Sequence, residues 1–117
     1  MAYISVAVYA VPTDNKETFI KHSKQMTPLF KKHGALAAVD CWGDDVPDGE
    51  VTSFPMAVKC EPGETVAYSH IIWPDKATHD AKMQSVMEEM QQVEKDHPMP
   101  FDGMRMIFGS FETVVEA

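Results

Sequence analysis

Residues 3–11, YISVAVYAV, alternate between two sets of side chains that are both largely apolar. Ile4 and Val8 fall on one side of an extended chain, while Tyr3 and Tyr9 fall on the other. Successive side chains of a strand point to opposite faces of its sheet, so both faces of this segment can be buried. The pattern predicts a strand in the interior of a sheet.

Two later segments have helical spacing instead. Residues 14–33 begin with a capping-box pattern, Asp14 followed three residues later by Glu17, and end at Gly34. Phe19, Met26, Phe30 and His33 recur at helical spacings of seven, four and three residues. A second helix is predicted after Pro74, with Asp75 as its cap. Its apolar positions are Met83, Val86, Met87 and Met90, and we expect this stripe to pack against the sheet.

Further runs rich in β-formers predict strands at 35–42, 54–60, 65–73 and 104–115. The polar segment 43–53 is expected to be a loop, after which 54–60 resumes the direction of the preceding strand. With right-handed crossovers, both helices then lie on one face of the sheet. The predicted fold class is α+β: a ferredoxin-like βαβ(β)βαβ antiparallel sheet forming one domain over residues 1–117.

Two helices on one face leave the other face of the sheet uncovered. We expect that face to carry Tyr3, Tyr9 and much of the apolar content of the remaining strands, which is more than a monomer usually exposes. A homodimer that pairs through the sheet face is therefore predicted.

Composition narrows the possible functions. A net charge of −8 on 117 residues disfavours binding to nucleic acid. The apolar start lacks the basic region of a signal peptide, and the two cysteines have no metal-ligand spacing, so we expect a cytoplasmic protein without membrane contact. The histidines include no metal-binding motif, and no nucleotide or hydrolase signature is present, so neither a metal nor another cofactor is predicted.

Three long runs carry a family resemblance: HGALAAVDCWGDDVPDGEVTSF (33–54), WPDKATHDA (73–81) and MPFDGMRMIFGSFE (99–112). They resemble the YbaA-like proteins, small bacterial proteins of unknown function in the dimeric α/β-barrel superfamily. The resemblance implies two ferredoxin-like protomers packed sheet against sheet. The chain departs from the family pattern at Ser5, His70, Ile72 and Met104, so the resemblance assigns no catalytic residue.

Strand alternation suggests one constellation of functional groups. Asp40 shares a face with Trp42, and an acid beside an aromatic side chain favours the barrel side of the sheet. If Asp40, His70 and Arg105 line one cavity, they could act as base, proton shuttle and anion-stabilising group, with Tyr9, Trp42 and Tyr68 around the ligand. In the alternative interpretation, Asp40 and Arg105 form an ordinary ion pair at the dimer seam.

The resulting hypothesis is a dimeric protein that binds a small organic molecule between sheet and helices, with cofactor-independent oxygenase or isomerase chemistry as its potential activity. The competing hypothesis is a non-catalytic binding or stress-associated dimeric module. A fold of this kind supports many activities, so the residues of the site have to decide between them.

Overall fold

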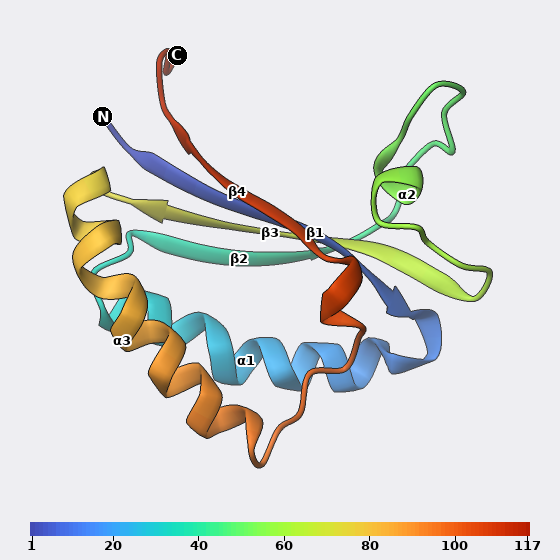
Figure 1. Ribbon diagram of the computed structural model, residues 1–117, viewed down its shortest axis with the longest axis horizontal. Coiled ribbons are helices and arrows are strands. Elements are labelled where there is room, and N and C mark those ends of the chain that lie inside the picture. Colours follow the sequence, from blue (N-terminus) through green and yellow to red (C-terminus); the bar gives the residue numbers. More distant parts are fainter.

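The computed structural model describes all residues from 1 to 117 and has one four-stranded antiparallel sheet with two long helices beneath it (Figure 1). The strands are β1 (Tyr3–Pro12), β2 (Ala37–Trp42), β3 (Glu64–Trp73) and β4 (Ile107–Glu112). The helices are α1 (Lys16–Lys32), the short α2 (Phe54–Ala57) and α3 (Lys76–Glu94), with 3-10 turns η1 (Thr13–Asn15) and η2 (Gly103–Arg105).

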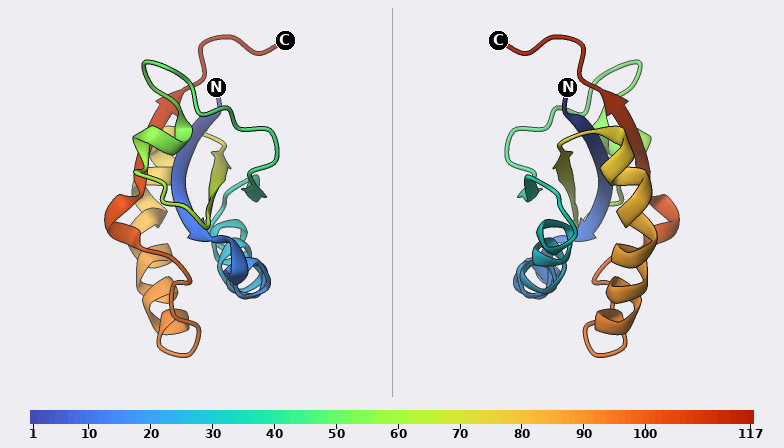
Figure 2. Two further views of the ribbon diagram at one scale, coloured as in Figure 1. Left: turned by 90° about the vertical axis from the view of Figure 1, so that its right-hand side faces the viewer. Right: turned by 90° about the vertical axis from the view of Figure 1, so that its left-hand side faces the viewer.

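The strand order across the sheet is β2-β3-β1-β4, and all neighbouring strands are antiparallel. β1 and β2 are thus parallel to each other on either side of β3, as are β3 and β4 on either side of β1. Both side views show α1 and α3 on the same face of the sheet (Figure 2). The predicted α+β, ferredoxin-like architecture is confirmed.

The strand predicted at 54–60 is wrong, because these residues begin with the helix α2. Ser53 caps this helix by accepting a hydrogen bond from the Met56 amide at 3.1 Å. Pro55 lies in the first turn, where its missing amide hydrogen costs nothing, whereas it would remove a ladder bond from a strand. The segment 43–63 is therefore one long excursion between β2 and β3.

The face of the sheet that packs on the helices carries Tyr9 and Val11 from β1 and Ala67 from β3, in one cluster with Phe19 of α1. At the other end of this face, Trp73 and Val86 of α3 are fully buried together. The expectation that Tyr3 and Tyr9 lie on the uncovered face is wrong, since Tyr3 also packs in the Trp73 cluster. The methionine stripe of α3 is confirmed at the two positions that pack against that cluster, Met83 and Met90, while Met87 is exposed.

The opposite face of the sheet, called the open face below, is covered only at one end. There the 43–63 excursion packs Val58 onto Val8 and Val66, and Val58 is fully buried. Elsewhere on this face, Val39, Ile107 and Phe111 are exposed. None of the helices combines the length and the hydropathy that crossing a membrane requires.

Candidate functional site

A chain of hydrogen bonds crosses three strands on the helix-covered face of the sheet. The Ser69 hydroxyl on β3 donates to Asp40 Oδ1 on β2 at 2.7 Å, and Tyr9 Oη on β1 lies 2.6 Å from Ser69 Oγ. Ser69 has one hydroxyl hydrogen, which goes to Asp40, so Tyr9 is the donor in the other bond. The chain therefore runs from Tyr9 through Ser69 to the carboxylate, and Asp40 Oδ2 has no protein partner.

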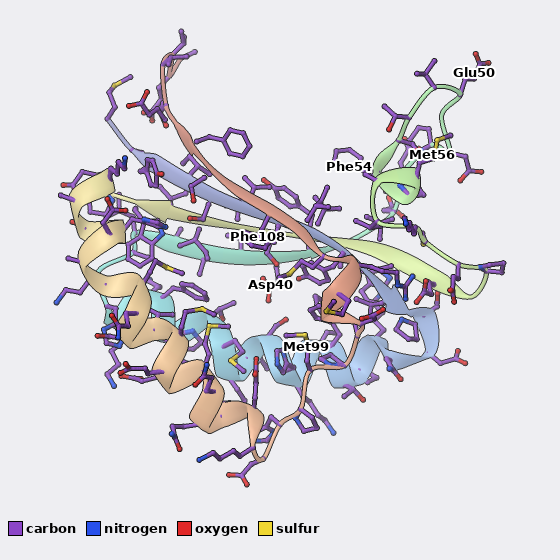
Figure 3. The ribbon with its side chains drawn as sticks, in the orientation of Figure 1. Asp40, Glu50, Phe54, Met56, Met99 and Phe108 are labelled. Carbon is purple, nitrogen blue, oxygen red and sulfur yellow. The ribbon has the colours of Figure 1, made fainter.

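The sheet register explains why these three residues meet. Asp40 lies directly opposite Ser69, and Tyr9 lies opposite Ala67, two residues before Ser69 on the same face. Asp40 points from its strand toward the helices, whereas Glu50 lies on the excursion at the far side of the sheet (Figure 3). The expectation that Asp40 faces the barrel side is thus wrong, because its strand partners belong to the helix side.

Tyr9 is only 4% exposed, and it packs between Phe19 and Phe101, with ring centroids 6.0 Å and 4.3 Å away. Burial raises the pKa of its phenol above the ordinary value, and the charge of Asp40 adds to the increase. Tyr9 therefore keeps its proton at neutral pH and acts as a donor rather than as a base.

His22 of α1 brings a polar side chain into the same layer. It is 9% exposed and lies on the buried stripe of α1 between Phe19 and Met26. Its Nε2 is buried and has no hydrogen-bond partner. Two other buried side-chain atoms also lack a partner, Ser23 Oγ and Trp73 Nε1. Of these three groups, only the imidazole is ionisable near neutral pH. Burial lowers the pKa of His22, although the charges of Glu94 and Asp40 oppose that shift. The imidazole is consequently neutral at pH 7.

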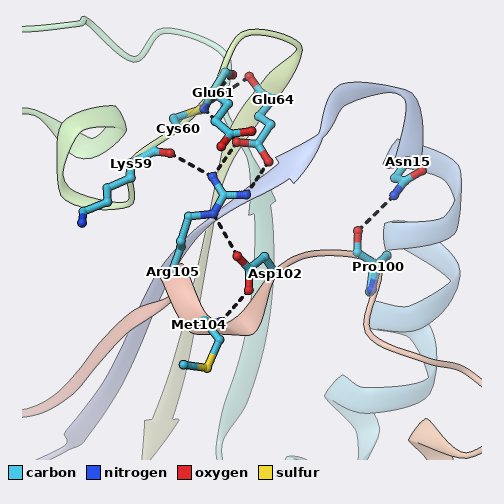
Figure 4. A network of polar contacts seen from close by, with 9 residues as sticks. All are labelled: Asn15, Lys59, Cys60, Glu61, Glu64, Pro100, Asp102, Met104 and Arg105. Carbon is cyan, nitrogen blue, oxygen red and sulfur yellow. Dashed lines mark hydrogen bonds and ion pairs between the residues drawn. The ribbon is translucent and has the colours of Figure 1, made fainter.

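Arg105 does not join this layer. Its guanidinium holds Glu64 through two hydrogen bonds of 2.7 Å and 2.6 Å, and it also donates to the Lys59 carbonyl and to Asp102 (Figure 4). The Arg105 hydrogen bonds lower the pKa of Glu64. This clasp ties η2 to the turn before β3, so the ion pair considered between Asp40 and Arg105 is replaced by one between Glu64 and Arg105.

The remaining predicted site residues divide between the two faces. Trp42 packs on Phe19 at 5.5 Å and has the Lys16 ammonium 5.6 Å above its ring, on the helix side. Tyr68 and His70 lie on the open face with their rings 5.5 Å apart. The structure therefore does not bring Asp40, His70 and Arg105 together in one cavity.

The open face has a groove of about 220 Å³ beside the excursion. Val8, Cys41 and Tyr68 form its floor, and Val46 and Phe54 form its wall. Its lining is mainly apolar, and none of the three candidate catalytic residues contributes to it. Of the three residues predicted to surround a ligand, Trp42 and Tyr68 line this groove and Tyr9 does not.

Sequence reasoning missed Ser69 and His22. For His22 there was a signal, because a polar residue three positions after Phe19 and four before Met26 interrupts an apolar stripe. For Ser69 there was none, since its role depends on the register between β3 and β2. No three His, Cys, Asp or Glu side chains lie close enough together to bind one metal ion.

The fold and the site define a ferredoxin-like α+β protein with a polar cluster between its sheet and its helices. Residues 2–103 match the family described as "Protein of unknown function (DUF1428)", and the chain belongs to this family. It is 46% identical over 116 residues to the uncharacterized protein YbaA of Escherichia coli strain K12, covering 99% of both chains. The YbaA of Shigella flexneri matches equally.

Among solved structures, the chain is similar to the de novo designed protein Foldit4, with a TM-score of 0.46 and 11% identity. That match covers 96% of this chain and 97% of the designed one. The identified relatives are uncharacterized, so the function has to be inferred from the residues of this chain.

Proposed function

We propose that the protein is a homodimer that binds a small organic molecule between the sheet and the helices of each protomer. The observation that carries this proposal is the imidazole of His22, buried without a partner in the layer that also holds the Tyr9–Ser69–Asp40 chain. A buried polar group without a partner costs free energy, and a bound molecule that supplies the missing hydrogen bond removes that cost.

The polar atoms of Asp40, Ser69, Tyr9 and His22 that lack a protein partner limit the chemistry that this site could perform. Asp40 Oδ2 has no protein partner and could accept a proton, and Ser69 and Tyr9 would stabilise the charge on Asp40 through the chain. Proton transfer of the isomerase type is consistent with this arrangement. Arg105 is occupied by Glu64, so the group expected to stabilise an anionic intermediate would not be available.

Pairing through the open face is supported by the apolar side chains left exposed there. Phe111 is 59% exposed on β4, and it belongs to the same face as Ile4, its partner across the ladder. Val39 and Ile107 extend the exposed patch across the sheet. A second copy would remove this apolar surface from water, which is the main favourable contribution to such an association.

The test is to screen uncharged, acidic and basic aromatic and alicyclic molecules by thermal shift. A molecule at 100 times its Kd stabilises the native state by about 2.7 kcal/mol, enough for a shift of several degrees. Ser69→Ala should abolish the shift, and His70→Ala, on the opposite face of the same strand, should retain it.

The outcomes separate the two hypotheses for this protein. Binding without any turnover of the bound molecule would favour the non-catalytic module. A shift that survives Ser69→Ala but disappears in His70→Ala would place the ligand on the open face and contradict the proposal. A screen in which no molecule produces a shift would contradict it as well.

A further inference from the structure

The charges and free acceptors around His22 indicate the chemical class of the ligand, an inference that rests on the proposed function. Asp40 offers Oδ2, and His22 offers Nε2 when its neutral ring carries the proton on Nδ1. Glu94, the last residue of α3, is one of the charged groups that act on His22. These groups are all hydrogen-bond acceptors.

No cation of the protein neutralises the two carboxylates. Neither Asp40 nor Glu94 takes part in an ion pair, and Arg105 is held by Glu64 and Asp102. The Lys16 ammonium lies over the Trp42 ring instead of contacting a carboxylate. The other ionisable group that acts on His22 is His97, which contributes no negative charge.

The arrangement of the acceptors argues against a metal ion. No three His, Cys, Asp or Glu side chains of the protein form a group that could hold one. The neighbouring rings of Tyr9, Phe19 and Trp42 favour an apolar body and are of the kind that attracts cations.

We propose that Asp40 and His22 together bind a small organic ammonium ion that has an aromatic or alicyclic body. Its N–H groups donate to Asp40 Oδ2 and to His22 Nε2, which gives the buried Nε2 the partner that it lacks in the protein.

Three probes with one skeleton test this assignment: 2-phenylethylamine, 2-phenylethanol and 3-phenylpropionate, each titrated by calorimetry at pH 7.5. A hydrogen bond to a charged group corresponds to about a tenfold or larger gain in affinity, so the amine should bind at least about tenfold more tightly than the alcohol. Asp40→Asn should remove that advantage and leave the affinity for the alcohol unchanged. Glu50→Gln, which removes a carboxylate from the excursion on the far side of the sheet, should change neither (Figure 3).

The His22 ring signals in NMR spectra distinguish failure of this inference from failure of the proposed function. If the alcohol or the carboxylate binds as tightly as the amine and moves those signals, the ligand class is wrong but the site stands. If the amine binds without moving them, or still binds with full affinity to Asp40→Asn, the assignment to this cluster is overturned. If no probe binds at millimolar concentration, the ammonium class is overturned, and the wider screen decides whether a site exists.

Discussion

Replacing Ser69 with alanine should destabilise the protein more than removing the Tyr9 hydroxyl, although the two groups share one hydrogen bond. Ser69→Ala leaves the buried phenol of Tyr9 without an acceptor, which costs about 1–3 kcal/mol. Tyr9→Phe removes the donor itself, and Ser69 still donates to Asp40, so its cost is only about 0.5–1.5 kcal/mol. The difference between the two costs follows from the direction of the hydrogen bonds, in which Tyr9 donates to Ser69 and Ser69 donates to Asp40.

The double variant Tyr9→Phe/Ser69→Ala should be no less stable than Ser69→Ala alone, because it contains no orphaned phenol. A thermodynamic cycle from urea denaturation at a fixed protomer concentration measures this coupling. In melting temperature, each kcal/mol corresponds to roughly 4 °C for a chain of this size. If the costs of Tyr9→Phe and Ser69→Ala add up to the cost of the double variant within about 0.5 kcal/mol, the two groups are not coupled and the hydrogen-bonded chain is refuted.

Three further predictions concern assembly, the clasp and the buried imidazole. If the protein is the dimer proposed above, Phe111→Lys on the open face should convert it into a monomer of 13.1 kDa in light scattering. Phe108→Lys, on the same strand but the opposite face and 79% exposed, should leave the dimer intact. Dissociation by both variants or by neither would contradict pairing through the open face. Arg105→Lys should lower the melting temperature at pH 7, because lysine cannot hold Glu64 with two bonds. The pKa of Glu64 is lower in the folded state than in the unfolded state, so the stabilisation by the clasp is present above pH 4.5 and is lost as the pH falls through the folded pKa. A stability difference between wild type and Arg105→Lys that does not change with pH would contradict the role of the clasp. The pKa of His22 is also lowered in the folded state, so the free energy of unfolding of the wild type should decrease as the pH drops below 6.5. In urea titrations, His22→Met should remove this pH-dependent decrease. The same pH dependence in both proteins would mean that the imidazole is not buried in solution.

The sequence pattern was sufficient to predict the two long helices and the four strands of the sheet. The spacing of Val86 with Met83 and Met90 correctly identified the face of α3 that packs on the sheet. The error at 54–60 came from treating an apolar run as extended, when Ser53 and Pro55 together form the start of a helix. For so short a segment, the cap and the proline are better guides than hydrophobicity.

The candidate site was harder to predict, for two physical reasons. Alternation assigns Asp40 and Trp42 to one face of the strand, but it cannot say whether that face meets the helices or the open side when both sets of side chains are partly apolar. The second reason is distance along the chain. Arg105 and Glu64 are separated by 41 residues, and only the folded chain shows that they are partners.

The distribution of polar groups between the two faces supports a function on the helix side. On the open face, the large exposed side chains Val39, Ile107 and Phe111 are apolar, and they are the residues that the proposed dimer would cover. The helix-covered layer is instead expected to be apolar throughout, yet it holds a carboxylate, a hydroxyl, a phenol and an imidazole. Replacing both partners of a buried hydrogen bond with apolar groups of the same shape can be nearly neutral or stabilising, so stability alone does not require these groups. His22 in particular lies where methionine would continue the stripe of Phe19 and Met26. Side chains that break a local packing rule are expected at functional sites, so the unpartnered imidazole makes the helix side the place to test for one.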